Sequence, residues 1–200
     1  MASGYAHTCA LTTAGGVKCW GMNQSGQLGD RTIANRLTPV NVSSLSGGVM
    51  ALVTGYNHSC ALTTTGGVKC WGANYAGQLG DPTLGYNLVP GDVSSLSGGA
   101  TAIAPGVGDH NCVLTTAGGI KCWGANGDGE VGSGTASLNQ PTPMAVVTLN
   151  SGVVAVAVGN DYTCALTILG GIKCWGSNFR GQLGDGTTTG RLTPVDVVGF

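Results

Sequence analysis

Residues 60–72 read Cys-Ala-Leu-Thr-Thr-Thr-Gly-Gly-Val-Lys-Cys-Trp-Gly, and this stretch decides the fold. Closely similar stretches begin at Cys9, Cys112 and Cys164, so successive first cysteines lie 51, 52 and 52 residues apart. A fixed period of this length is typical of repeat architectures. Four repeats, which we place at 4–54, 55–105, 106–158 and 159–200, cover essentially all of the 200 residues.

Within each repeat, apolar and polar residues alternate with a period of two, which predicts β-strands. A turn through Thr13-Ala14-Gly15 would set Cys9 opposite Cys19, with Gly15 free to take a positive φ. Another strand is expected after each hairpin, in a Thr-Pro-Val type segment, and it would be the fourth of its repeat. A preceding apolar strand is expected at 49–53, 100–104 and 153–158, but that of the first repeat is missing.

These patterns predict an all-β fold of fifteen short antiparallel strands. Four strands in a unit of about 50 residues are typical of a propeller blade. We therefore expect residues 1–200 to form a single propeller-type domain, or a slice cut from a longer propeller array. Met1 to Tyr5 lack the charged and apolar pattern of a signal peptide.

Composition excludes several classes of function. The formal net charge is −1, with eight Lys plus Arg, so the chain does not offer the basic face that a nucleic-acid binder needs. It has no run of about 18 apolar residues, which argues against insertion into a membrane. The 37 glycines suit many tight turns between strands.

The eight cysteines form one pair in each repeat, ten residues apart. Opposed residues of a hairpin come close enough for a disulfide, and disulfides would indicate an extracellular or cell-envelope location. Two alternatives are buried reduced thiols and a zinc site, the latter disfavoured by the lack of a Cys-x-x-Cys clip. The expected pairs are Cys9 with Cys19, Cys60 with Cys70, Cys112 with Cys122 and Cys164 with Cys174.

Two aromatic positions recur in the repeats. A tryptophan follows each second cysteine, and we expect it to pack between blades rather than to form a ligand-stacking ring. A histidine precedes three of the first cysteines, with tyrosine in the fourth repeat, which fits a structural hydrogen bond better than a general base. These residues are Trp20, Trp71, Trp123 and Trp175, and His7, His58, His110 and Tyr162.

Charged residues recur as well. Asp30, Asp81 and Asp185 lie in loops, but Ca²⁺ needs six to eight oxygen ligands, so we expect each carboxylate to cap its own turn. The repeated lysines, of which Lys18 is the first, lie opposite small residues, so their stems are expected to follow the blade surface. We expect no metal site and no cofactor.

The segment Gly-x-x-His-Thr/Ser-Cys-Ala-Leu, followed by Gly-Gly-Val-Lys-Cys-Trp-Gly-x-Asn-x-x-Gly-Gln-Leu-Gly-Asp, resembles the regulator of chromosome condensation repeat family. The resemblance implies a β-propeller, usually of seven blades. Functions in the family include guanine-nucleotide exchange, ultraviolet sensing and β-lactamase inhibition, and many members are uncharacterised secreted bacterial proteins. The paired cysteines are most similar to those of the secreted group.

Two of the family functions fit poorly. The family's exchange factor carries an inserted hairpin, whereas these repeats differ in length by one residue. The ultraviolet receptor senses light through a Gly-Trp-Arg-His-Thr segment. Here the corresponding residues are Gly4-Tyr5-Ala6-His7-Thr8, without Trp or Arg.

We therefore expect a non-enzymatic interaction scaffold that displays loops on disulfide-stapled blades to a protein partner. The chain offers no candidate nucleophile, acid–base pair or metal cluster. An alternative is a self-assembling structural protein, a homo-oligomer in which chains complete each other's propeller or form a ring or fibre. The candidate binding residues, chosen from the variable loops and the adjoining rim, are Tyr5, Arg31, Arg36, Tyr56, Tyr86 and Arg191.

Overall fold

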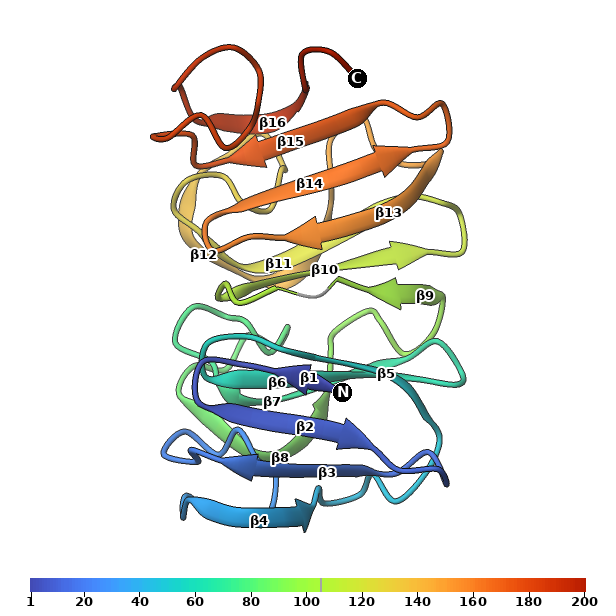
Figure 1. Ribbon diagram of the computed structural model, residues 1–200, viewed down its shortest axis with the longest axis vertical. Helices are drawn as coiled ribbons and strands as arrows, with labels where there is room; N and C mark the ends of the chain where they lie inside the picture. Colours follow the sequence, from blue (N-terminus) through green and yellow to red (C-terminus); the bar gives the residue numbers. More distant parts are fainter. Residues whose placement is uncertain (105) are drawn as a thin grey trace.

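The computed structural model describes residues 1–104 and 106–200. Strands joined by turns make up this part of the chain, and it contains no helix of the length and apolar character needed to cross a membrane. The strands form four separate antiparallel sheets of four strands each, which follow one another along the long axis of the molecule (Figure 1). The all-β fold with propeller-type blades is thus confirmed.

Each sheet is one blade, and its strands lie in chain order. Blade 1 contains β1 (Ala2–Ser3), β2 (His7–Leu11), β3 (Val17–Gly21) and β4 (Arg36–Asn41). Blade 2 contains β5 (Val49–Thr54), β6 (His58–Thr63), β7 (Val68–Ala73) and β8 (Tyr86–Asp92). Blade 3 contains β9 (Ala100–Ile103), β10 (His110–Thr115), β11 (Ile120–Asn126) and β12 (Ser137–Ala145). Blade 4 contains β13 (Val153–Val158), β14 (Tyr162–Thr167), β15 (Ile172–Gly176) and β16 (Arg191–Asp196).

The expectation that the first strand of the first repeat is missing was wrong. Ala2 pairs with Cys9 and Ser3 with Thr8, so a two-residue β1 completes blade 1. The free edge of β2 supplies hydrogen-bonding groups even to a segment without an apolar pattern. Sixteen strands are therefore present in the described residues, against the fifteen expected.

The central hairpin of each blade has the register that the sequence predicts. In blade 1, Cys9 lies opposite Cys19 and Ala10 opposite Lys18, and Gly15 takes a φ of 76° in the turn. The Lys18 ammonium donates to Asn41 Oδ1 of the neighbouring strand at 2.8 Å. The lysine therefore lies along its own blade, as expected, and does not reach out toward a ligand.

All four predicted disulfides are present, each joining opposed residues of one hairpin. Their Cα atoms lie 4.1 Å apart, which is close to the short spacing of a non-hydrogen-bonded antiparallel pair. Each of the first three lies on the face of its blade that looks toward the next blade. We call that face the rear face, and the opposite face, which carries the tryptophan, the front face.

The two ends of the blades differ in which turns they carry. The β2–β3, β6–β7, β10–β11 and β14–β15 turns lie at one end, together with the segments that link the blades; this is the hairpin end, on the right of Figure 1. The turns between the first two strands of each blade lie at the opposite end. The long loops that follow β3, β7, β11 and β15 start there, and this is the loop end.

Candidate interaction surface

The tryptophans close the junctions between consecutive blades. Trp71 is fully buried, and its Nε1–H donates to the backbone carbonyl oxygen of Gln27 in the preceding blade at 2.9 Å. Its ring packs in one cluster with the Cys9–Cys19 disulfide and Leu28 of blade 1. The expected packing of tryptophans between blades is therefore confirmed. Trp71, Trp123 and Trp175 are all fully buried, so none of these rings is open to a ligand. The other two junctions repeat the bond, from Trp123 to Gln78 at 3.0 Å and from Trp175 to Glu130 at 2.8 Å.

A second donor reaches the same carbonyl oxygen in every junction. Ser59 Oγ donates to the Gln27 carbonyl at 2.9 Å, so this hydroxyl accepts the hydrogen bond from His7 Nε2, also at 2.9 Å. This order of donors assigns the proton of His7 to Nε2. The same relay runs from His58 through Asn111 to the Gln78 carbonyl, and from His110 through Thr163 to the Glu130 carbonyl.

The histidines of this relay are buried in an uncharged form. Burial lowers the pKa of His7 to about 4 and that of His110 to about 3, and it lowers the pKa of His58 as well. Their Nδ1 atoms have no hydrogen-bond partner among the described residues. The rings therefore serve as neutral donors across the junctions, which supports the structural interpretation of these histidines.

The loop end varies from blade to blade. Tyr5 of blade 1 is 64% exposed and stacks on Tyr56 of blade 2, with ring centroids 4.3 Å apart and planes inclined by 14°. Tyr75 and Phe179, which are 66% and 77% exposed, lie in the first turn of the loops after β7 and β15. Backbone hydrogen bonds to the turns before β6 and β14 hold both segments at this end, because Ala73 N–H donates to the Asn57 carbonyl and Ser177 N–H to the Asp161 carbonyl.

The loop end of blades 3 and 4 carries several carboxylates. Asp109 and Asp161 lie in the turns before β10 and β14, and Asp128 follows β11. The side chain of Gln78 donates to Asp109 Oδ1 at 3.2 Å across the second junction. At the third junction Glu130 replaces that glutamine, and burial, together with the nearby Asp128 and Asp161 charges, raises the pKa of its carboxyl. The loop end thus carries exposed aromatic rings on blades 1, 2 and 4 and carboxylates on blades 3 and 4, with the exposed Arg180 beside Phe179.

Two of the candidate arginines, which begin β4 and β16, pair with aspartates of the loops that precede these strands. Arg36 Nε bonds to Asp30 Oδ2 at 2.7 Å, and Arg191 pairs with Asp185 in the same way. Each aspartate also accepts the backbone N–H two residues further on, so the expected turn caps are confirmed. These arginines hold the long loops in shape. Arg31 is exposed with a φ of 70°, and Tyr86, also exposed, begins β8 opposite Ala73.

The sequence interpretation missed the asparagine that organises each long loop. Asn23 is fully buried; its amide donates to Asp30 and to backbone carbonyls of the loop, and its Oδ1 accepts from Leu28 N–H. The signal was its presence in all four repeats. Tyr75 and Phe179 were also missed, because they occupy a position that differs in every repeat: Gln24, Tyr75, Gly127 and Phe179.

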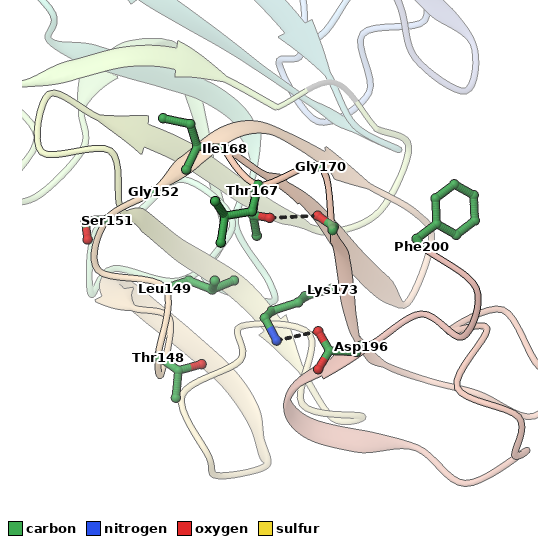
Figure 2. Close-up of a pocket in the computed structure, with 12 residues that line it drawn as sticks. Thr148, Leu149, Ser151, Gly152, Thr167, Ile168, Gly170, Lys173, Asp196 and Phe200 are labelled. Atoms are coloured by element: carbon green, nitrogen blue, oxygen red, sulfur yellow. Dashed lines mark hydrogen bonds and ion pairs between the residues drawn. The ribbon is translucent and has the colours of Figure 1, made fainter.

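A cavity of about 620 Å³ opens at the hairpin end of blade 4 (Figure 2). The equivalent position in blades 1, 2 and 3 is occupied by a buried leucine, whose carbonyl accepts from the start of β3, β7 and β11; these are Leu45, Leu96 and Leu149. Phe200 holds that position in blade 4 and is 77% exposed. Lys173 and Asp196, paired at the cavity wall, repeat the Lys69–Asp92 pair. This cavity is the fourth copy of a packing site and brings no new chemistry.

Among the described residues, no group of three or more His, Cys, Asp or Glu side chains is arranged to hold a metal ion. The features that remain are closed, repeated junctions and a loop end that varies from blade to blade. They define a β-propeller repeat protein whose variable surface is the loop end.

Family comparison gives the same assignment from the sequence. A family model described as "Regulator of chromosome condensation (RCC1) repeat" matches residues 1–27, 51–78, 102–130 and 153–182. A second model with this description matches residues 118–166. The chain belongs to the RCC1-repeat family.

Two curated relatives illustrate the range of that family. The human protein "Probable E3 ubiquitin-protein ligase HERC4" is 36% identical over 203 residues, which cover 100% of this chain but 19% of that protein. The "Ultraviolet-B receptor UVR8" of Arabidopsis thaliana is 34% identical over 198 residues, covering 97% of this chain and 44% of the receptor. The chain therefore spans less than half the length of either relative.

Solved structures support the fold. Human WBSCR16 superimposes with a TM-score of 0.84 at 26% identity, over 96% of this chain and 50% of that chain. Prp20p of Saccharomyces cerevisiae superimposes with a TM-score of 0.85 at 23% identity, over 98% and 49%. At that identity the yeast protein shows the fold alone.

Proposed function

We propose that this chain is a non-catalytic scaffold that binds a protein partner through its loop end. The observation that carries the proposal is the set of exposed aromatic side chains there, because exposed aromatic rings are enriched in protein interfaces. The stacked Tyr5 and Tyr56 are pre-ordered by each other, so binding would cost little of their side-chain entropy. The repeated junctions beneath them supply a rigid base.

The chemistry of the loop end favours a particular kind of partner. The loop end carries aromatic rings on blades 1, 2 and 4 and carboxylates on blades 3 and 4, so a segment that carries both apolar and basic residues would match both kinds of side chain. Arginine suits this surface best, because it pairs with carboxylates and stacks on aromatic faces.

Related proteins are compatible with a protein-binding role. Yeast RCC1 (Prp20) has been solved bound to Kap60, and the structure of Prp20p is described together with its binding to Gsp1p and histones. HERC4 is named as a ligase, but this chain matches only 19% of that protein. The four disulfides support an oxidising location, extracellular or in the cell envelope.

Selection from a displayed random-peptide library on the disulfide-intact protein tests this function. We expect enriched peptides to combine Arg or Lys with apolar residues and to lose binding to a Tyr5→Ala/Tyr56→Ala variant. The matched control is Ile168→Ala/Leu169→Ala, which removes two exposed apolar side chains at the hairpin end. Failure to enrich any peptide, or equal binding to the tyrosine variant, would contradict the proposal.

A further inference from the structure

The third junction, between blades 3 and 4, differs from the other two at the side chain nearest the loop end. At the second junction Gln78 Nε2–H donates across the interface to Asp109 Oδ1 at 3.2 Å, and the first junction has the equivalent bond at 3.4 Å. At the third junction the equivalent residues are Glu130 and Asp161. Two carboxylates therefore face each other where the other junctions have a donor and an acceptor.

The direction of the Glu130 side chain follows from its anchored oxygen. Glu130 Oε2 accepts the backbone N–H of Asp128 at 2.9 Å. The equivalent Gln78 Oε1 accepts the backbone N–H of Ala76 at the same distance of 2.9 Å. Glu130 Oε1 therefore takes the place of the Gln78 amide nitrogen, and it points toward Asp161 as that nitrogen points toward Asp109.

This second oxygen of Glu130 lacks a partner although the side chain is buried. Glu130 is only 4% exposed, and its Oε1 accepts no hydrogen bond from the residues that the structure describes. Among those residues, the buried polar atoms without a partner are the three histidine Nδ1 atoms, so Glu130 Oε1 retains contact with solvent. A ligand can therefore reach this oxygen from the loop end.

The negative charge at the third junction is not neutralised by a basic side chain of residues 1–104 and 106–200. Burial, together with the Asp128 and Asp161 charges, raises the pKa of the Glu130 carboxyl, as expected for a carboxylate without a counter-charge. The ion pairs of this part of the chain involve neither these carboxylates nor the exposed Arg180. These pairs are Arg36–Asp30, Lys69–Asp92, Lys173–Asp196 and Arg191–Asp185.

We propose that Glu130 and Asp161 bind an arginine side chain of the partner that the loop end recognises, an inference that rests on the proposed function. A guanidinium presents several N–H donors in one plane, so it can donate to Glu130 Oε1 and Asp161 Oδ1 together. Asp161 Oδ2 already accepts from Asn160 Nδ2 at 2.5 Å, which leaves Oδ1 for the ligand. Asp128 adds a third negative charge close to the pair.

Arginine fits this site better than lysine or a metal ion. The guanidinium is more weakly hydrated than an ammonium, so its transfer to a partly buried site costs less, and its fork matches two acceptors. In the described part of the chain, no three His, Cys, Asp or Glu side chains are arranged to hold a metal ion. Phe179, two residues beyond the Ser177 N–H that bonds to the Asp161 carbonyl, adds an exposed ring of the kind on which arginine stacks.

Nuclear magnetic resonance of the disulfide-intact protein, labelled at its side-chain carboxyl carbons, tests the site without a known partner. The probe is N-acetyl-arginine amide, and its control is N-acetyl-citrulline amide, which has the same shape but no charge. We expect the arginine probe to shift the Glu130 and Asp161 signals saturably, N-acetyl-lysine amide to bind more weakly, and the citrulline probe to leave both signals unchanged. No saturable shift, or an equal response to citrulline, would overturn the proposal.

Glu130→Gln is the decisive variant, because it restores the amide of the other junctions and should not weaken the fold. We expect it to abolish the shift of the Asp161 signal with no fall in melting temperature, which separates a binding role from a structural one. The matched control Asp92→Asn removes one carboxylate at the hairpin end and should leave the shift unchanged. A shift retained in Glu130→Gln would contradict the arginine site.

The arginine site and the scaffold function can fail separately. Peptides selected on the loop end should bind Glu130→Gln at least about tenfold more weakly, because one partner of a charge pair is lost. Selected peptides that bind this variant as tightly as the unsubstituted protein would contradict the arginine site alone. Binding of the arginine probe without enrichment of any peptide would contradict the scaffold function alone.

Discussion

The blade junctions and the loop end are built on opposite principles. At the junctions the same donors and acceptor recur three times, and variation is limited to Ser59, Asn111 and Thr163, which all act as both donor and acceptor. At the loop end the equivalent residues differ in chemistry, and Asp109 and Asp161 stand where blades 1 and 2 have Ala6 and Asn57. Uniform junctions hold the blades in a fixed relation, and the varied loops use that fixed base to present a distinctive surface.

The largest effect should come from breaking a junction. Trp71→Ala removes a fully buried ring and leaves a cavity between blades 1 and 2, so we expect a loss of about 3–5 kcal/mol in the free energy of unfolding. Urea denaturation monitored by circular dichroism measures it. Trp20→Ala is the matched control, and it should cost much less, because Trp20 is only half-buried. Equal losses in the two variants would contradict the distinction between covered and uncovered faces.

Removal of a disulfide should cause the second-largest loss of stability. Each closes a loop with a sequence separation of 10 residues, so Cys60→Ala/Cys70→Ala should cost about 2–3 kcal/mol by loss of the loop constraint. Cys164→Ala/Cys174→Ala removes a loop of the same length on the uncovered rear face of blade 4. The comparison of the two melting temperatures isolates the packing contribution of the buried disulfide. A smaller loss for the buried pair than for the outer pair would argue against packing between blades.

Acid should loosen the junctions before it affects the loops. The pKa of His7 falls to about 4 and that of His110 to about 3 in the folded protein, against 6.5 as the ordinary value, because burial disfavours the charged rings. Between these values the unfolded chain binds more protons. Stability is therefore complete above pH 6.5 and falls toward pH 4, by up to about 1.4 kcal/mol per pH unit for each histidine.

The raised pKa of Glu130 has the opposite effect on stability. Just above the ordinary pKa of a glutamate the folded state binds more protons than the unfolded state, so acidification there increases stability. Melting temperatures measured from pH 7.5 to pH 4 check the sum, and His110→Asn should flatten the dependence. A stability that rises on acidification over this range would contradict buried neutral histidines.

A smaller effect, an increase in the free energy of unfolding, is expected for a substitution at the third junction. Glu130→Gln would restore the amide that Gln78 uses toward Asp109 and remove a charge near Asp161, so it should stabilise the protein by about 0.5–1 kcal/mol at pH 7. The reciprocal variant Gln78→Glu should destabilise by a similar amount. Thermal unfolding of both variants checks the pair, and two shifts of the same sign would refute the assignment.

Much of the fold could be predicted from the sequence because repetition constrained it. Four copies of one cysteine spacing left a single consistent pairing, and Gly15 marked the hairpin turn. The two-residue β1 could not be predicted, because Ala2 and Ser3 carry no alternating pattern and join the sheet only through the edge of β2.

The surface was harder to predict than the fold. Tyr5 and Tyr56 were found because tyrosine recurs at one position of two repeats, whereas Tyr75 and Phe179 occupy a position that differs in every repeat. Arg36 and Arg191 were chosen as exposed charges in variable loops. Their pairing with Asp30 and Asp185 depends on how each loop folds back on itself, which spacing alone does not reveal.

Hydrogen exchange in the presence of a library-selected peptide tests the division between junctions and loop end most directly. We predict that the peptide slows exchange in residues 4–6, 55–57, 74–78 and 177–182, and leaves the hairpin turns and the junction strands unchanged. Protection concentrated at the hairpin end, or spread along the junctions with the loop end unaffected, would contradict the account.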